Sequence, residues 1–329
     1  MSALDVELLR ALRASSVHLP GADLAVQSGV PLEEVEHRLA ELCAAGFEIE
    51  QRPGLGHRLL SAPDRIIADD LTSRLGPCAL VREIVVYEET DSTNDRASQL
   101  GAQGVAGGVA IFAERQTAGR GRFGRRWESA SHRGLWFSLL LRPELPLPLW
   151  PRLTTWCAVS LAGAIEAATG LRTAIKWPND IHLGSRKICG VLVETGFDQQ
   201  GAPFAVVGIG VNVNHEPEDF PAELAEKAGS LHLAAGRMLD RAALAVAILR
   251  ELDARHAALA HDFPALVAEA GHRSMLLGRW IEVRAADSVL AGIAERLDAD
   301  GQLLVRAADG ELRTLNAGEV TLAPLSARS

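Results

Sequence analysis

Residues 119–127 read Gly-Arg-Gly-Arg-Phe-Gly-Arg-Arg-Trp, with four arginines and three glycines in nine positions. Glycine lets a backbone pass close to a ligand, and arginine offers a planar fork of donors for carboxylate and phosphate oxygens. Gly119, Gly121 and Gly124 also match the Gly-x-Gly-x-x-Gly spacing of dinucleotide-binding folds, in which a helix begins at the glycines. Here a strand over 134–141 is predicted to follow. We therefore predict an anion-binding loop in a mixed α+β fold, with a solvated basic loop as the alternative.

Lysine and asparagine are rare in this chain, and they gather near one another. Only three of the 33 basic residues are lysine, and two of these, Lys176 and Lys187, lie close together in the sequence. Four of the five asparagines fall in short polar segments in the middle of the chain: Asn94, Asn179, Asn212 and Asn214. A compact cation and a small donor–acceptor pair are what a polar ligand site needs. The alternative is chance clustering, with asparagine serving turns.

Composition limits the class of protein. The 329 residues are 48% hydrophobic and 23% charged with a net charge of −9, which predicts a soluble globular chain of two or three domains. That charge argues against nucleic acid or an anionic membrane as a general partner. No apolar run approaches the ~20 residues that span a bilayer, and the acidic, amphipathic N-terminus does not resemble a secretion signal. The cysteines are scattered without a C-x-x-C pair, so we expect neither a zinc site nor disulfides, and a cytoplasmic location.

Hydrophobic spacing predicts three domains. Three helices followed by a two-stranded hairpin are typical of a winged helix-turn-helix, predicted for residues 1–63. A mixed α+β domain is predicted for 78–270, including a helical segment over 239–268 in which Pro264 marks a candidate interruption. Short strands separated by Asp-Gly turns predict a small SH3-like β-barrel for 271–329. The predicted strands of the last two domains are 83–87, 108–114, 135–141, 173–177, 181–183, 187–194, 205–213, 280–284, 290–297, 302–307 and 311–316.

Five short motifs occur in one order along the chain. They are Asp91-Ser92-Thr93-Asn94, Gln116 with Gly119–Trp127, Lys176–Asp180, Lys187–Gly190 with Glu194, and Gly208-Ile209-Gly210-Val211-Asn212. The series closely resembles the biotin protein ligases over nearly the whole chain. With the N-terminal domain, the arrangement is similar to the bifunctional ligase–repressor subclass. The resemblance implies a class II synthetase-like central domain.

The chemistry of that family suits these residue types. The biotin carboxylate attacks the α-phosphate of ATP to give biotinyl-adenylate and pyrophosphate, and a lysine of a carrier domain then attacks the mixed anhydride. Because two anions must meet in the first step, cations and backbone N–H groups have to offset their repulsion. The resemblance implies that biotin is held by Ser92, Thr93, Asn94, Gln116, Arg120, Gly121, Arg122 and Lys187.

The resemblance also assigns the remaining roles. Catalysis would rest on Lys187, Arg122 and Arg120, and Asp180 would help to hold Mg²⁺. The nucleotide would be bound by Lys176, Asn179, Asn212 and Trp127. From the residues alone, Ser92 is equally a helix N-cap, Asp180 a turn residue and Lys187 an exposed hairpin cation.

Partners and rivals follow from the same resemblance. It implies a biotin carboxyl carrier protein domain as partner and is compatible with a homodimer, and no membrane partner is expected. One rival is a lipoate–protein ligase, which shares the central fold; the Gly-Arg-rich loop and Lys-Trp-Pro-Asn-Asp favour biotin. The other is a repressor that uses biotinyl-adenylate only as corepressor.

The predicted DNA-reading helix is acidic. It begins at Pro31 and carries Glu33, Glu34 and Glu36, and residues 1–63 hold five arginines and nine acidic residues for a net charge of −4. Affinity for DNA depends on cations that neutralise phosphates. We therefore expect DNA binding to be weak or absent, which counts against the repressor.

Overall fold

The protein is described from a computed structural model that places residues 3–285 and 288–322. These residues form two compact units: the first runs to Cys78 and includes Asp240–Val246, and the second comprises Ala79–Leu239 and the chain from Ala247 onward. The last seven positions of the predicted C-terminal domain, 323–329, lie outside the described residues, as do 286–287. No helix in the described part of the chain is long and apolar enough to cross a membrane.

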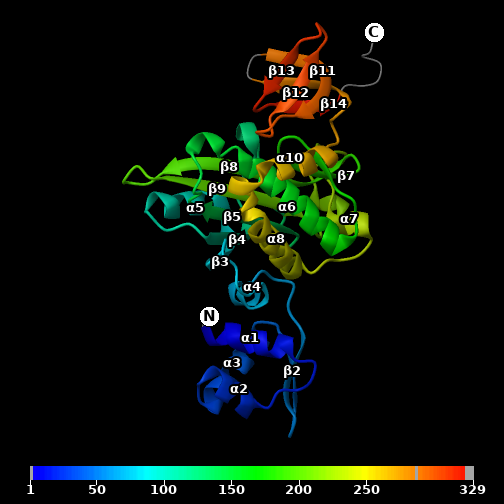
Figure 1. The fold of residues 1–329 in the computed structure, drawn as a ribbon. Helices are drawn as coiled ribbons and strands as arrows, with labels where there is room; N and C mark the ends of the chain where they lie inside the picture. The colour runs from blue at the N-terminus through cyan, green and yellow to red at the C-terminus, as the bar shows by residue number, and fades with distance from the viewer. Residues whose placement is uncertain (1–2, 286–287, 323–329) are drawn as a thin grey trace. The chain divides into compact units, whose positions relative to one another are not determined.

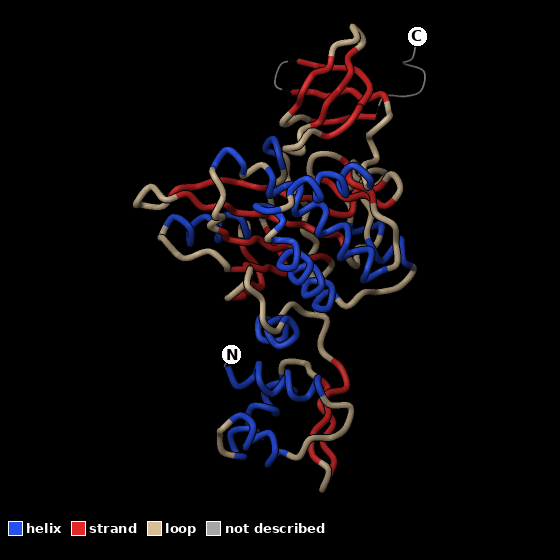
Figure 2. Tube along the Cα trace, viewed as in Figure 1, coloured by secondary structure: helices blue, strands red, loops and turns tan. Residues whose placement is uncertain are grey.

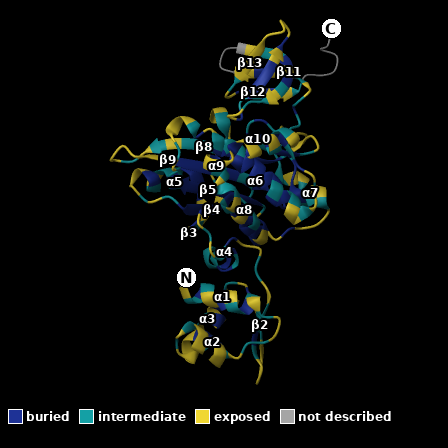
Figure 3. Cartoon of the chain, in the orientation of Figure 1, coloured by how far each residue is buried: buried dark blue, intermediate teal, exposed yellow. Residues whose placement is uncertain are grey.

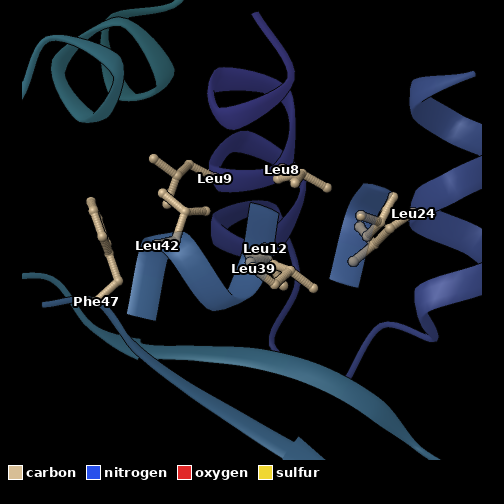
Figure 4. Packing of buried hydrophobic residues seen from close by; sticks show 8 residues of the cluster. Leu8, Leu9, Leu12, Leu24, Leu39, Leu42 and Phe47 are labelled. Atoms are coloured by element: carbon tan, nitrogen blue, oxygen red, sulfur yellow. The ribbon is translucent and has the colours of Figure 1, made fainter. Parts of the chain in front are cut away.

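Leucines at helical spacing build the first unit. Its three N-terminal helices bury one shared core with Phe47, seen in Figure 4. Gly29 ends the second helix in the left-handed conformation (φ 70°), which glycine adopts without steric cost. The elements are α1 (Ala3–Ala14), α2 (Gly21–Ser28), α3 (Leu32–Ala44), β1 (Glu48–Arg52), β2 (Gly56–Ser61) and α4 (Ala68–Leu75). Strands β1 and β2 pair antiparallel, so three helices followed by a hairpin are present as predicted.

Helix α4 was not predicted. It lies where the sequence indicated only a linker, because it is eight residues long and its N-cap, Ile67, supplies no capping side chain. Its anchor is a buried carboxylate: Asp70 forms ion pairs with Arg13 of α1 and with Arg74 one turn further along α4. The pair with Arg13 joins positions 57 residues apart and therefore leaves no local sequence signal.

A seven-stranded sheet forms the body of the second unit (Figures 1 and 2). The strands lie in the order β3-β4-β5-β9-β8-β7-β6, with β3 and β4 parallel and every other pair antiparallel. All residues of β5 are buried, which is why it reads as a continuous apolar run; Figure 3 shows the contrast with the exposed loops. The strands are β3 (Glu83–Thr90), β4 (Val109–Gln116), β5 (Gly134–Leu141), β6 (Ala174–Lys176), β7 (Asp180–Leu183), β8 (Arg186–Phe197) and β9 (Pro203–Asn212).

Two helices mark the two faces of the sheet. α5 (Thr93–Ala102) contacts β4, β5, β8 and β9, whereas α6 (Arg152–Thr169) contacts β6, β7 and β8. Cys157 of α6 lies near Cys189 of β8, and burial raises the pKa of both thiols. Side chains alternate along a strand, so the face that carries Gly190 points away from α6 and is free to hold a site.

The helical segment predicted over 239–268 is present and is interrupted just before Pro264, where an interruption was considered; a further break after His256 was not predicted. The segment consists of α8 (Arg241–His256), α9 (Ala258–His261) and α10 (Phe263–His272), with Pro264 in the first turn of α10. Proline is tolerated there because the first-turn N–H groups lack helical partners in any case. A further short helix, α7 (Leu231–Ala235), begins at Ser230, whose hydroxyl accepts a hydrogen bond from the Leu233 N–H. It was not predicted.

Five antiparallel strands complete the second unit. They lie in the order β13-β12-β11-β10-β14, one strand more than predicted. Their core also takes in Trp177, whose indole Nε1 donates to the Gly301 carbonyl oxygen at 3.0 Å. The strands are β10 (Trp280–Ala285), β11 (Ser288–Leu297), β12 (Leu303–Ala307), β13 (Leu312–Leu315) and β14 (Glu319–Leu322). The residue that follows Lys176 is therefore fixed by the C-terminal sheet.

Candidate active site

A row of paired residues crosses five strands on the face opposite α6. Lys176 of β6 pairs with Asp180 of β7, Asp180 with Gly190 of β8, Gly190 with Gly210 of β9, and Gly210 with Trp136 of β5. Residues paired across strands point to the same face of a sheet. The row therefore runs from charged groups, across two positions without side chains, to an aromatic ring.

The two glycines leave room for the indole of Trp127. A Cβ at Gly210 would lie 2.5 Å from the Trp127 ring, and one at Gly190 would lie 2.8 Å from it. The indole Nε1 of Trp127 is buried without a hydrogen-bond partner among the described residues. Such a donor suits an acceptor supplied by a ligand.

The loop 119–127 is closed on itself by backbone hydrogen bonds. The Trp127 N–H donates to the Gly119 oxygen at 2.9 Å, and the Gly121 N–H donates to the Arg125 oxygen at 2.7 Å. Phe123 adopts a left-handed conformation (φ 57°), the only departure inside the short 3₁₀ turn η1 (Arg122–Gly124). The loop is thus a compact flap, and of its four guanidinium groups those of Arg120 and Arg122 contact residues of the site.

Cations converge at the charged end of the row. Lys187 Nζ lies 2.7 Å from Asp180 Oδ1 and 5.0 Å from the centre of the Trp127 ring. Arg122 Nη1 donates to Asn179 Oδ1 at 3.0 Å. Burial lowers the pKa of both Arg122 and Lys176, because each loses hydration with too little nearby negative charge to compensate. This end of the site is short of anions and suits a carboxylate or phosphate ligand.

A hydrogen-bonded cluster lies at the start of α5. Gln116 Oε1 accepts from the Thr93 N–H at 2.8 Å, and the Ser138 hydroxyl donates to Asn94 Oδ1 at 2.6 Å. Ser92 is buried and occupies the N-cap position, but its side chain makes no capping bond. A Cβ at Gly208 would lie 2.2 Å from Asn94 Oδ1, so β9 must carry glycine there. The cluster offers several polar groups in a small volume.

The aromatic end extends beyond the sheet. Trp136 meets Trp127 and His215 edge to face, at centroid distances of 6.2 and 5.6 Å, and His215 stacks on Phe220 at 5.1 Å. Asn212, at the end of β9, donates from Nδ2 to the Gly229 oxygen at 3.0 Å. Flat aromatic faces beside a strand end suit a heteroaromatic ligand.

Asp180 is a single carboxylate. In the described part of the chain, no three His, Cys, Asp or Glu residues come together as a metal cluster. Mg²⁺ that arrives with a nucleotide takes most of its ligands from phosphate and water, with one or two protein carboxylates. Asp180 fits such a minor share.

The fold thus brings the expected site residues to one face. Arg120 differs from the others in its partners, because its guanidinium is hydrogen-bonded to the carboxylates of Asp95 and Glu194. Sequence reasoning missed Asp95, Ser129 and Ser138 as contributors. Their partners are distant in sequence, so only the alternating glycines of β9 indicated a close approach at this face.

The site consists of a flap with basic side chains above two glycines of the sheet. Desolvated cations lie at one end of it and aromatic rings at the other. This arrangement defines a ligase site that activates a carboxylic acid with a nucleotide. Residues 86–214 match the Biotin/lipoate A/B protein ligase family, and residues 276–322 match the Biotin protein ligase C terminal domain. The "Bifunctional ligase/repressor BirA" of Bacillus subtilis (strain 168) is 32% identical over 299 residues, covering 91% of this chain and 92% of its own. The chain belongs to the biotin protein ligase family.

Two further similar proteins, one found by sequence and one a solved structure, are also biotin ligases. The "Biotin--[acetyl-CoA-carboxylase] ligase" of Mycobacterium tuberculosis is 31% identical over 245 residues, covering 73% of this chain and 88% of its own. A solved structure of the biotin protein ligase from Aquifex aeolicus, in complex with biotin and ATP, superposes with a TM-score of 0.63 at 29% identity, covering 73% of this chain and 98% of that one.

Proposed function

We propose that this protein activates biotin with ATP to biotinyl-5′-adenylate and transfers the biotinyl group to a lysine of a biotin carboxyl carrier protein. The observation that carries the proposal is the meeting of Lys187, Lys176 and Arg122 at the charged end of the row, under an arginine-rich flap. The first step brings two anions together, so preorganised cations lower its barrier. The solved relative with biotin and ATP supports these two substrates.

The contacts suggest a role for each group. Asn94, Thr93 and Gln116, with Ser92 at the N-cap, would bind the polar rings of biotin. Lys187 would contact the carboxylate and α-phosphate as they react, and Arg122 and the Gly121 backbone would hold the adenylate from the flap. The resemblance places Arg120 with the same anions. Its guanidinium is instead hydrogen-bonded to the carboxylates of Asp95 and Glu194.

The nucleotide would occupy the other end. Lys176 and Asn179 would face phosphate, Trp127 would cover the bound intermediate, and Asn212 would lie beside the ribose or base. Mg²⁺ would enter with ATP and take Asp180 as a protein ligand, supplying charge neutralisation at the phosphates. Lys187, already paired with Asp180, lies close enough to act on the same oxygens.

The domain plan we propose is a winged helix-turn-helix over 1–63, a catalytic domain over 78–270 and a small SH3-like domain over 271–329, in a cytoplasmic protein. The three helices and hairpin of the first unit and the five short antiparallel strands at the other end support this division. A homodimer is compatible with it.

A repressor role is the second candidate function, favoured by the names of relatives such as that of Bacillus subtilis and by the N-terminal elements. The charges oppose it. Arg38 pairs with Asp5 and Glu41, and Arg52 pairs with Glu50, so these cations are already neutralised within the unit. We propose that DNA binding is weak or absent.

A transfer assay tests the proposed function. The full chain, a carrier domain, MgATP and radiolabelled biotin should yield labelled carrier, whereas lipoate in place of biotin should not. Efficient transfer of lipoate with no transfer of biotin would overturn the proposal in favour of a lipoate–protein ligase.

A further inference from the structure

Arg120 has its charge satisfied inside the protein. Its Nη1 donates to Asp95 Oδ1 of α5 at 2.6 Å, and its Nη2 donates to Glu194 Oε2 of β8 at 3.1 Å. Hydrogen bonds in which both partners are charged are about twice as strong as neutral ones. These two bonds tie the start of the flap to a helix and to a strand.

The carboxylate of Glu194 has a second partner. Its Oε2 also accepts from Asn94 Nδ2 at 2.5 Å, and Asn94 Oδ1 in turn accepts from Ser138. The contact fixes which side of the Asn94 amide is its donor, because the N–H group must face Glu194. One carboxylate therefore orients a group in the head-group cluster and holds the flap that covers it.

Arg120 and Arg122 differ, although only one residue separates them. Burial would lower the pKa of Arg120, but its bonds to Asp95 and Glu194 outweigh burial and raise that pKa. For Arg122 burial prevails and lowers the pKa, since its hydrogen-bond acceptor is the neutral Asn179 amide. Both side chains are cations, but the charge of Arg120 is neutralised by two carboxylates, whereas Arg122 donates to a neutral amide and can offer its charge to a ligand.

We propose that Asp95, Arg120 and Glu194 form a latch that holds the flap 119–127 closed, so that all three are positioning residues for the biotin ligase reaction rather than groups that contact the reacting atoms. This inference rests on the proposed function only for its kinetic consequence. A closed flap keeps the adenylate from water until a carrier lysine arrives. When the latch is released, the flap moves and the intermediate escapes.

The rate of cleavage by trypsin within the flap tests the latch directly. The flap holds four arginines, and neither Asp95→Asn nor Glu194→Gln changes any of them. Both variants should raise the rate of tryptic cleavage within 120–126 of the ligand-free full chain about three- to tenfold, the range expected when a charged contact of a partly exposed pair is weakened. Asp95→Asn is the cleaner variant, because the Asp95 carboxylate accepts a hydrogen bond from Arg120 and, unlike Glu194, does not contact Asn94.

Matched variants control for charge and for global stability. Glu128→Gln removes an exposed ion pair between Arg126 and the residue directly after the flap, which ties the flap to no other element, so it should leave cleavage within twofold of wild type. In an Arg120→Met background, Asp95→Asn should add nothing further. Cleavage in Asp95→Asn no faster than in Glu128→Gln, or an equal increase with and without Arg120, would overturn the latch.

Kinetics then separate positioning from binding. Asp95→Asn should shorten the lifetime of bound biotinyl-adenylate several-fold while leaving kcat for adenylate formation within twofold. Glu194→Gln should in addition raise the KM for biotin, because it also supports Asn94. A fall in kcat of adenylation beyond tenfold in Asp95→Asn would make Arg120 a catalytic group instead. If wild-type protein forms no biotinyl-adenylate, the proposed function fails, while the cleavage comparison still decides the latch.

Discussion

At the scale of single residues, the ammonium group of Lys187 offers the sharpest test of the chemistry. Lys187→Met retains much of the stem and removes the charge that lies 2.7 Å from Asp180. Loss of one preorganised electrostatic contact costs roughly 10²–10³ in rate, so biotin-dependent exchange of pyrophosphate into ATP should fall by that factor. Lys227→Met, at an exposed lysine, is the control. Near-normal exchange in Lys187→Met would remove this residue from the mechanism.

Arg122 is expected to retain the intermediate. Arg122→Gly should leave the fold intact, since the side chain makes one hydrogen bond, to Asn179. It should release biotinyl-adenylate, which would then label lysines of a bystander protein without selectivity. Arg126→Gly introduces the same glycine into the flap at an exposed arginine and controls for backbone freedom. Bystander labelling equal in the two variants would contradict a specific role for Arg122.

His182 makes stability depend on pH. It is buried on β7, where desolvation lowers its pKa from 6.5 to about 4 despite the nearby Asp180 carboxylate. Between about pH 6.5 and 4, His182 is protonated in the unfolded chain but neutral in the folded chain. The free energy of unfolding therefore falls as the pH drops through this range. At pH 5 the loss is about 2 kcal/mol, from the two pKa values and the linkage relation.

The measurement compares thermal unfolding of wild type and His182→Leu at pH 7.5 and pH 5. The drop in midpoint on acidification should be smaller in the variant, because leucine takes up no proton. Parallel drops in the two proteins would show that His182 titrates normally in the folded state.

At the scale of elements, strand β9 is expected to tolerate no side chain under the flap. Gly210→Ala places a Cβ where the Trp127 ring lies, 2.5 Å away. Overpacking of this kind costs about 1–3 kcal/mol, which at this site should appear as a KM for biotin raised roughly five- to a hundredfold. Gly271→Ala, where the nearest atom is an ordinary 3.8 Å away, is the control. An unchanged KM would mean that the indole does not rest on this strand when biotin binds.

Elements with a strong local pattern were predicted well. The apolar run of β5 was predicted to within one residue of its ends, and hydrophobic spacing predicted the three N-terminal helices. Helix α4 was not, because the ion pair of Asp70 with Arg13 of α1 comes from tertiary structure. In the helical segment predicted over 239–268, Pro264 marked one interruption, whereas the break after His256 carries neither glycine nor proline and was missed.

The site divides in the same way. Motif residues such as Lys187 and Asn94 could be named from sequence because rare polar types clustered there. The partners of Arg120 could not, since Asp95 and Glu194 lie 25 and 74 positions away and meet it only once α5 and β8 are packed. The sequence indicated that Arg120 is a cation for a ligand, whereas in the fold its guanidinium contacts two carboxylates.

At the scale of the whole molecule, the expected absence of tight DNA binding can be measured. The N-terminal residues 1–63 carry a net charge of −4, so few phosphates can be neutralised. A titration of the full chain with the promoter of its own operon, at about 150 mM salt with biotin and ATP present, should show no specific complex. A Kd near 10⁻⁸ M or tighter, the range usual for specific binders, would contradict this expectation.

Charge neutralisation provides the companion experiment. Replacing Glu33, Glu34 and Glu36 together by glutamine should strengthen non-specific binding to DNA at low salt, because three like charges no longer oppose the phosphates. Removal of residues 1–63 should leave DNA-linked regulation unchanged. Regulation lost on removal would assign the N-terminal segment a role in transcription.

Trp177 makes the packing of the segment next to Lys176 depend on how much of the chain has been synthesised. Its ring belongs to the core of the C-terminal sheet, whose last core strand is β14, so this neighbour of Lys176 gains its packing only after roughly 140 more residues have left the ribosome. At about 5–20 residues per second, the segment around Lys176 in the nascent chain lacks this packing for about 7 to 30 s. A ligase with this construction is expected to gain catalytic competence only after the C-terminal sheet has been synthesised, so that a partly made chain releases little reactive adenylate into the cell.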